Sequence, residues 1–248
     1  MTNENRVQLQ PAFVLHQRAY RDTSAIVDLF TEDYGRVSLV ARGARSKRSA
    51  YRAILQPYSL LVVSWSGRGE LKTLSNAEQK DTPIVLSGDA MISGIYLNEI
   101  LLRLLPSFDP YEDLFQSYQQ TLKALNQSSG QQRALRLFEK QLLSNLGYEL
   151  NLAVDINSGE TVNPAALYYF LPDHGPVRTD LKNQGRQTQF SGRSLLSFSQ
   201  HELDDEESLR DAKKIMRIAL QPLLGTRPLK SRELYRALVN KQHLSLSD

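Results

Sequence analysis

The apolar residues of this chain change their spacing near residue 80, and this change constrains the fold more than any other feature. Before it, short apolar runs are separated by turn-forming residues, and after it apolar residues recur every three or four positions. Short runs between turns are typical of strands, whereas the longer spacing is typical of amphipathic helices. We therefore expect an α+β fold that begins with a β module and continues as a mainly helical body.

The β module contains five strand-like runs with a single long interruption. The runs are residues 12–16, 25–30, 36–41, 60–65 and 70–74. Asp33-Tyr34-Gly35 and Ser66-Gly67-Arg68-Gly69 supply turns between neighbouring runs. The interruption, residues 46–55, is long enough for a short helix. Five strands with one short helix predict a small closed barrel that the helix plugs at one end.

The middle of the chain shows the signals of three helices. The first is apolar on most sides and ends before Pro106. For the second we expect an N-cap at Asp109 and Pro110 in the first helical position. For the third we expect Ser129 to open a capping box and Gly147 to form a left-handed C-cap.

The remainder of the chain is rich in turn formers up to about residue 200, with short apolar pieces such as Leu167–Leu171. The acids Asp204–Glu207 then favour the start of a helix, because the positive end of its dipole lies there. A last helix is expected from Ser231 to about Val239. The expected domains are a barrel in residues 1–80, a helical bundle in 81–148, and a loop-rich region with C-terminal helices packing on the bundle in 149–248.

A run of basic residues in the β module is the strongest functional signal. Between Tyr34 and Gly69 no acidic residue occurs, and the basic residues there are Arg36, Arg42, Arg45, Lys47, Arg48, Arg52 and Arg68. Such a run is often a solvated loop with counterions. On a barrel it favours contact with nucleic-acid phosphates, whose counterions are released on binding. Lys72, Lys230 and Arg232 are added as candidates for the same track.

Four aromatic residues, Tyr34, Tyr51, Tyr58 and Trp65, are interleaved with these charges. On a barrel surface some of them could stack on bases. A lone tryptophan in an alternating strand is more often a core residue, so we place the DNA contacts on the basic side chains and not on Trp65.

The sequence offers no signal for an active site, and we expect no catalytic residue, metal or cofactor. The four histidines lack metal-ligand spacing, cysteine is absent, and neither a phosphate loop nor a nucleophile elbow occurs. A metal-dependent nuclease using Asp204 and Asp205 is the alternative from the enzyme class, although helix capping explains these acids more simply. No secretory signal or membrane span is expected, and a cytoplasmic location is.

Several segments together resemble the bacterial RecO family of DNA repair and recombination mediator proteins, in its proteobacterial, zinc-free branch. They are residues 12–16, Gly43–Ser49, Leu55-Gln56-Pro57, Tyr96–Leu101, Phe138-Glu139 through Tyr148, and Pro228–Leu234. Each segment is modest alone, but their order and spacing are specific. Many relatives carry a cysteine zinc site after the position of Tyr148, which this chain cannot form.

The resemblance implies an N-terminal OB-fold, a central helical bundle and a smaller C-terminal region. It also implies binding of single- and double-stranded DNA, strand annealing, association with RecR, contact with the acidic C-terminal tail of single-stranded DNA-binding protein, and a functional link to RecA. Such a tail needs apolar side chains rimmed by arginine. Arg133, Arg136 and Phe138 are the candidates for it, although they also suit an ordinary amphipathic helix. An RNA-binding OB-fold protein is the remaining alternative.

Overall fold

The computed structural model describes residues 6–127, 129–179 and 188–245, and the chain forms two compact units. The first unit comprises residues 1–128 and 227–248, and the second comprises residues 129–226. The barrel therefore shares a unit with the two helices that follow it and with the C-terminal helix. The expected boundaries at residues 80 and 148 do not coincide with this division.

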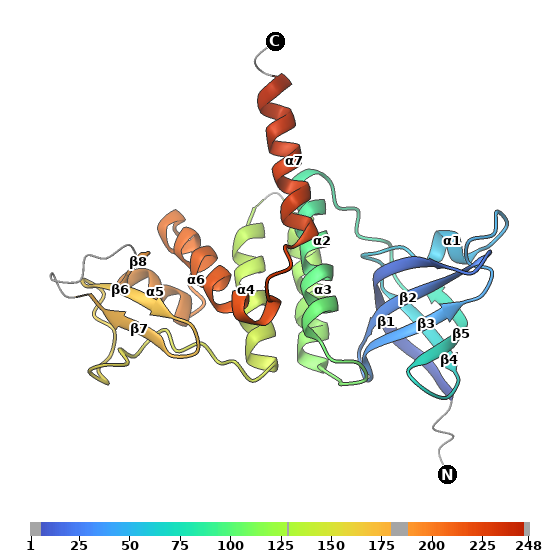
Figure 1. The fold of residues 1–248 in the computed structure, drawn as a ribbon, viewed down its shortest axis with the longest axis horizontal. Coiled ribbons are helices and arrows are strands. Elements are labelled where there is room, and N and C mark those ends of the chain that lie inside the picture. Colours follow the sequence, from blue (N-terminus) through green and yellow to red (C-terminus); the bar gives the residue numbers. More distant parts are fainter. Residues whose placement is uncertain (1–5, 128, 180–187, 246–248) are drawn as a thin grey trace. The chain divides into compact units, whose positions relative to one another are not determined.

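A closed five-stranded barrel begins the first unit, as the sequence predicts (Figure 1). Its strands are hydrogen-bonded in the order β1-β2-β3-β5-β4. Its elements are β1 (Arg6–Tyr20), β2 (Ser24–Thr31), β3 (Gly35–Ala41), α1 (Tyr51–Ile54), β4 (Leu61–Ser66) and β5 (Leu71–Gln79). Four of the strand pairs are antiparallel, and β3 and β5 run parallel to close the barrel. The short helix lies between β3 and β4, where the interruption of strand-like sequence predicts it.

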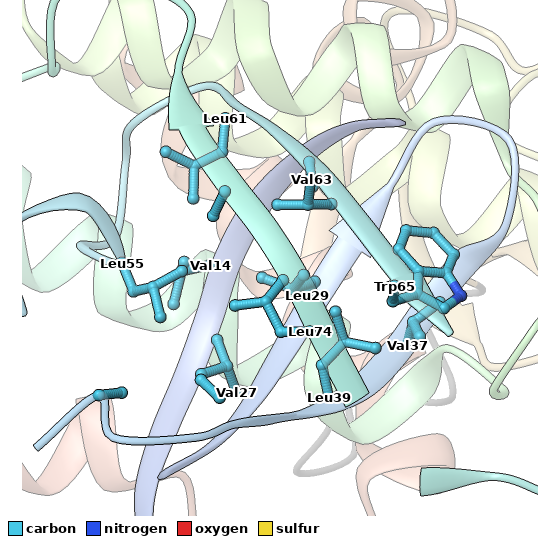
Figure 2. Close-up of a cluster of buried hydrophobic side chains, with 14 of the residues drawn as sticks. Val14, Val27, Leu29, Val37, Leu39, Leu55, Leu61, Val63, Trp65 and Leu74 are labelled. Carbon is cyan, nitrogen blue, oxygen red and sulfur yellow. The ribbon is translucent and has the colours of Figure 1, made fainter. Parts of the chain in front are cut away.

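Alternating apolar side chains fill the barrel (Figure 2). Along β3, for example, Val37 and Leu39 are fully buried while Ser38 between them is partly exposed. Trp65 is 2% exposed, so the expectation that it belongs to the core is confirmed. Leu55, just after α1, joins the same cluster and closes one end of the barrel. Burial of each such side chain stabilises the fold by about 1.5–3 kcal/mol.

Two helices of the first unit, α2 (Gly88–Leu104) and α3 (Glu112–Leu125), cover the barrel's outer surface at β1 and β2. Tyr118 of α3 packs edge-on against Phe13 of β1 with ring centroids 5.1 Å apart. Phe115 contacts both Phe13 and Phe30 at 5.4 Å. Aromatic pairs of this geometry add about 0.5–1.5 kcal/mol beyond the area they bury.

A buried amide links the helices to an irregularity in β1. The register of β1 against β2 shifts between Val14 and His16. Asn98 of α2 donates from Nδ2 to the carbonyl oxygens of Val14 and Leu15 at 3.3 and 3.1 Å, and its Oδ1 accepts from the Tyr118 hydroxyl at 2.5 Å. The side chain thus satisfies carbonyl groups that a buried irregularity exposes.

The described residues of the second unit form three helices and a small sheet. The helices are α4 (Gln131–Asn145), α5 (Gly192–Ser199) and α6 (Glu206–Leu224), and the strands are β6 (Leu167–Leu171), β7 (Gly175–Arg178) and β8 (Gln189–Ser191). The sheet has the order β7-β6-β8. The sequence indicated only a loop-rich region with short apolar pieces here, and that interpretation missed the sheet. Helix α6 begins after its N-cap Asp205, as the run of acids predicts.

Two helix starts differ from the expectation. Helix α3 begins at Glu112 after Tyr111, so the predicted N-cap at Asp109 and the first-turn position of Pro110 are wrong. The carboxylate of Asp109 instead accepts a hydrogen bond from the Tyr111 hydroxyl at 2.6 Å. Helix α4 follows Gly130, whose φ of 79° is left-handed, and no side chain caps it, so the predicted cap at Ser129 is also wrong.

The C-terminal end of α4 lies where the sequence predicts it, and that of α7 lies further along the chain. Gly147 has φ +85° after α4, and the Tyr148 amide donates back to the Leu143 carbonyl at 2.9 Å, which confirms the left-handed cap. The last helix, α7 (Lys230–Ser245), is longer than expected.

Among the described residues, every helix is too short or too polar to cross a membrane.

Candidate nucleic-acid interface

The basic segment, residues 42–52, follows β3 and is folded as a series of tight turns. Gly43 adopts φ +68°, which an L side chain rarely does, and starts the first turn. The Ser46 and Ser49 amides donate to carbonyls three residues earlier, at 3.0 and 3.1 Å. Ala44 is 1% exposed and anchors the segment in the barrel core. The exposed side chains around this anchor are Arg42, Arg45, Lys47, Arg48 and Arg52.

Arg45 connects the basic segment to the turn between β1 and β2. Its amide donates to the Thr23 carbonyl at 2.8 Å. Its guanidinium reaches the carbonyl oxygens of Arg21 and Asp22 at 3.2 and 3.4 Å. Arg45 therefore has a positioning role in addition to its charge, because it holds two loops side by side.

This contact brings in two arginines that the sequence reasoning did not single out. Arg18 and Arg21 are exposed at the end of β1 and in the turn after it. Arg18 lies opposite Ile26 in β2, which lies opposite Val40 in β3, two residues before Arg42. We call the resulting set the cationic end: Arg18, Arg21, Arg42, Arg45, Lys47, Arg48 and Arg52. None of these side chains forms an ion pair with a carboxylate of the described residues.

The other predicted DNA contacts of the barrel lie near the opposite end of β3. Because β5 runs parallel to β3 and Ser38 pairs with Leu71, the turn before β5 projects toward the start of β3. With seven residues in β3 and about 3.3 Å per residue, the two ends are about 20 Å apart. Arg68, in that turn, is exposed. The structure thus divides the predicted track into two groups.

Two members of this second group have partners within the fold. Arg36 donates from Nε to the Leu105 carbonyl at 2.9 Å. Lys72 donates to the Gly67 carbonyl at 3.3 Å, and its ammonium lies 5.2 Å from the centroid of the Phe108 ring. Arg36 therefore holds the loop after α2 against the barrel, and Lys72 is only partly exposed.

The remaining DNA candidates, Lys230 and Arg232, lie in the first turn of α7 and not on the barrel. Their helix packs on α2, and the Lys230 amide donates to Glu99 of α2 at 2.8 Å. The Lys230 side chain is exposed and that of Arg232 is partly exposed. They are therefore accessible cations on a separate element of the same unit.

The candidate tail-binding residues lie in the second unit, and two of them are buried. Phe138 is 1% exposed and belongs to the interior. Arg136 is 7% exposed and forms an ion pair with Glu139 at 3.1 Å, while its Nε is buried without a hydrogen-bond partner. Arg133 is half exposed and donates to the His201 carbonyl at 2.8 Å.

Two basic residues of α6, Lys213 and Arg217, add positive charge near Arg136. Burial lowers the pKa of Lys213, and the neighbouring charges of Arg136 and Arg217 lower it further, against the opposing effect of Glu139. We call Arg136, Lys213 and Arg217 the α4–α6 cationic cluster. The sequence showed Lys213 and Arg217 as part of a basic helix face but gave no sign that a buried arginine from α4 adjoins them.

The acids considered for a nuclease have structural roles. Asp205 accepts hydrogen bonds from the Ser208 amide and hydroxyl at 2.9 and 2.7 Å, and these bonds lower its pKa. Asp204 lies 3.9 Å from Arg133. Within the described part of the chain, no group of three or more His, Asp or Glu side chains is arranged to hold a metal ion.

The closed barrel with its helix between β3 and β4, followed by helices and a small sheet, defines an α+β protein built on an N-terminal OB-fold. Comparison of the sequence with known families gives a more specific assignment. Residues 6–83 match the model described as "Recombination protein O N terminal", and residues 86–233 match "Recombination protein O C terminal".

Individual relatives agree with the family models. The chain is 45% identical over 231 residues to the DNA repair protein RecO of Coxiella burnetii (strain RSA 331 / Henzerling II), covering 92% of this chain and 98% of the relative. It is 44% identical over 233 residues to the RecO protein of Yersinia pestis (strain Pestoides F), covering 94% and 95%. The chain belongs to the RecO family, and the resemblance found in the sequence is confirmed.

Proposed function

We propose that this protein is a non-enzymatic recombination mediator that binds and anneals single-stranded DNA in the cytoplasm and associates with the nucleoid when bound. With RecR, it would help load RecA onto strands coated by single-stranded DNA-binding protein. Family membership supports a role in DNA repair and recombination. The cationic end supports DNA as the direct ligand, for duplexes as well as single strands, because it offers charge to phosphates without reading bases.

One observation carries this proposal. Seven basic side chains from the end of β1, the turn after it and the basic segment gather at one end of the barrel, and no carboxylate of the described residues pairs with them. Asp22 is the acid of the turn after β1, and its carbonyl, not its carboxylate, receives Arg45. An unneutralised cluster of this kind raises the local concentration of polyanions and makes their binding depend on salt.

Charge removal at the cationic end tests the proposal. Arg42, Lys47 and Arg48 are exposed and make no contact that positions a loop, so the triple alanine variant should fold. If each neutralises one phosphate, the slope of log affinity against log salt for a single strand should become shallower by about 2, at about 0.7 per contact. The matched control replaces Arg178, Arg193 and Arg210, three exposed cations of the second unit, and should leave the slope unchanged. Equal salt slopes for the two variants would exclude the cationic end as the DNA-binding surface.

Activity on strands separates the mediator from the alternatives. A mediator should accelerate annealing of complementary strands coated with single-stranded DNA-binding protein, and labelled DNA incubated with magnesium should keep its length. Shortened DNA would favour the nuclease. Stronger competition by RNA than by DNA of the same sequence would favour an RNA-binding role.

The α4–α6 cationic cluster is the candidate site for the acidic tail of single-stranded DNA-binding protein. The exposed side chains of Lys213 and Arg217, next to the buried Arg136, can receive a terminal carboxylate. Phe138 is buried in α4 and would act only through packing. This placement replaces the expectation that Phe138 itself contacts the tail.

Substitution on α6 tests this site without disturbing the buried ion pair. Arg217→Ala should weaken binding of a synthetic acidic tail peptide about tenfold, as expected for loss of a charged hydrogen bond. Arg210→Ala, on the same helix but outside the cluster, is the control. If the tail peptide is amidated at its C-terminus, wild type and Arg217→Ala should bind it with equal affinity. Equal loss of affinity in Arg217→Ala and Arg210→Ala would show that only general electrostatic attraction is involved.

A further inference from the structure

Two partly exposed aromatic rings lie near the start of β3, away from the cationic end. Tyr34, in the turn between β2 and β3, is 37% exposed, and Phe108, in the loop between α2 and α3, is 36% exposed. Both lie in the first unit. The two residues are 74 positions apart in the sequence, and only the fold brings their segments together.

Close backbone packing brings the two segments into contact. The Phe108 amide donates to the Arg36 carbonyl at 3.0 Å, and Ser107 pairs with Arg36 in a parallel bridge. Gly35 separates Tyr34 from Arg36, and a Cβ atom on Gly35 would lie 1.7 Å from the Asp109 carbonyl oxygen. Tyr34 and Phe108 therefore flank a contact so close that only glycine fits at its centre.

Each ring is held in place from one side. Tyr34 packs edge-on against the buried Trp65, with ring centroids 5.3 Å apart and planes at 83°. Phe108 has the Lys72 ammonium 5.2 Å from its ring centroid. Rings fixed in this way lose little further freedom when a flat ligand stacks on them.

The backbone of Phe108 is in an unfavourable conformation. Its φ of +59° is left-handed, which a bulky side chain rarely adopts and which costs on the order of 1–3 kcal/mol. The fold thus keeps a partly exposed phenylalanine where glycine or asparagine would be less strained.

The charges near these rings do not favour phosphate. The basic residues Arg36, Arg68 and Lys72 are offset by the acids Glu32, Asp33, Glu70 and Asp109 in the same turns and strand ends, so the charges nearly cancel. A ligand here is therefore recognised by its flat face more than by negative charge. Unpaired bases have such a face, and aromatic side chains on OB-folds stack with them.

We propose that Tyr34 and Phe108 form a stacking site for unpaired bases, so that a strand held by phosphate at the cationic end is also held by its bases about 20 Å away along β3. The inference rests on the proposed binding of DNA by the barrel and extends it. The cationic end binds any phosphate backbone, whereas the stacking site distinguishes single strands from duplexes, whose bases are not available.

Ring removal combined with base removal tests the stacking site. Phe108→Leu keeps apolar bulk but removes the ring, and should lower affinity for a single-stranded oligonucleotide about fivefold or more, the lower end for one stacked base. Affinity for a duplex and the salt slope should not change. Phe108→Tyr keeps the ring and should bind as the wild type does. An oligonucleotide with abasic sites should bind wild type and Phe108→Leu equally.

The controls separate this inference from the proposed function. Leu9→Ala removes an exposed aliphatic side chain of β1, 69% exposed, and should leave affinity unchanged. If the charge variants of the cationic end alter binding but Phe108→Leu binds as the wild type does, the stacking site is wrong and the proposed function stands. Equal losses on abasic and normal strands, or equal losses from Leu9→Ala and Phe108→Leu, would also overturn it.

Discussion

The carboxylate of Glu99 in α2 accepts hydrogen bonds from the amide and the hydroxyl of Ser231, 132 residues later, at 2.9 and 2.7 Å. The Lys230 amide donates to the other carboxylate oxygen. These are first-turn groups of α7, which have no partner within their own helix. On the same side, Arg103 donates to the carbonyls of Arg227 and Pro228. One turn of α2 therefore holds the start of the C-terminal helix.

Loss of this cap should loosen α7 before the rest of its unit. Glu99→Ala removes the acceptor of three hydrogen bonds and should lower the free energy of unfolding by about 1–3 kcal/mol. Hydrogen exchange of the amides between Leu234 and Leu238 should accelerate, while barrel amides remain protected. Glu70→Ala, which removes an exposed acid in a turn, is the control. Uniform acceleration over the whole unit would contradict a local role.

The same carboxylate predicts a pH dependence. Partial burial opposes ionisation of Glu99, but the hydrogen bonds from Ser231 and Lys230 and the charge of Arg103 bring its pKa below the ordinary value of 4.5. A lowered folded pKa stabilises the protein above the unfolded pKa, and this contribution disappears as pH falls through the folded value. The stability difference between wild type and Glu99→Gln should therefore be constant from pH 7 to about 5 and shrink below about 4.5. Urea unfolding at each pH measures it, and a difference that grows on acidification would contradict the assignment.

The contact between Gly35 and Asp109 predicts unequal effects of two glycine substitutions. Gly35 and Gly43 both have left-handed φ angles, but a Cβ on Gly43 meets nothing within 4 Å, whereas on Gly35 it overlaps the Asp109 carbonyl. Gly43→Ala should lower the free energy of unfolding by about 1 kcal/mol, the conformational strain alone. Gly35→Ala should cost clearly more, because backbone must move. Denaturant unfolding of both variants provides the comparison, and equal losses would show that the loop after α2 yields easily.

The buried network around Asn98 gives a further stability prediction. Tyr118→Phe removes one hydrogen bond and leaves the Asn98 Oδ1 without that donor, which should cost about 1–2 kcal/mol. Asn98→Ala leaves the carbonyls of Val14 and Leu15 without the amide and opens a cavity, so it should cost more. Thermal unfolding of the two variants measures the order. The reverse order would show that water enters and replaces the amide.

The fold was predictable where local pattern determines structure, and the site only in part. Turn formers and the short apolar runs between them located all five barrel strands, because each strand has a face in one core. The predicted N-cap at Asp109 failed because its segment packs on Gly35, 74 residues away, which no local signal reveals. The sheet containing β6 was missed because its strands are short and separated by turn formers. Likewise, the buried position of Phe138 depends on packing against other helices of its unit.

The cationic end shows the same limit, and it yields the last prediction. Arg18 and Arg21 lie outside the acid-free run that drew attention to the basic segment, and the contacts of Arg45 with the carbonyls of Arg21 and Asp22 place them beside it. If both contribute to DNA binding, the double alanine variant should make the single-strand salt slope shallower by about 1.4, at about 0.7 per phosphate. The Arg21 carbonyl remains in this variant, so the loop contact is retained. Arg178 and Arg193 together are the matched control, and an unchanged slope in the Arg18 and Arg21 variant would confine the interface to the segment after β3.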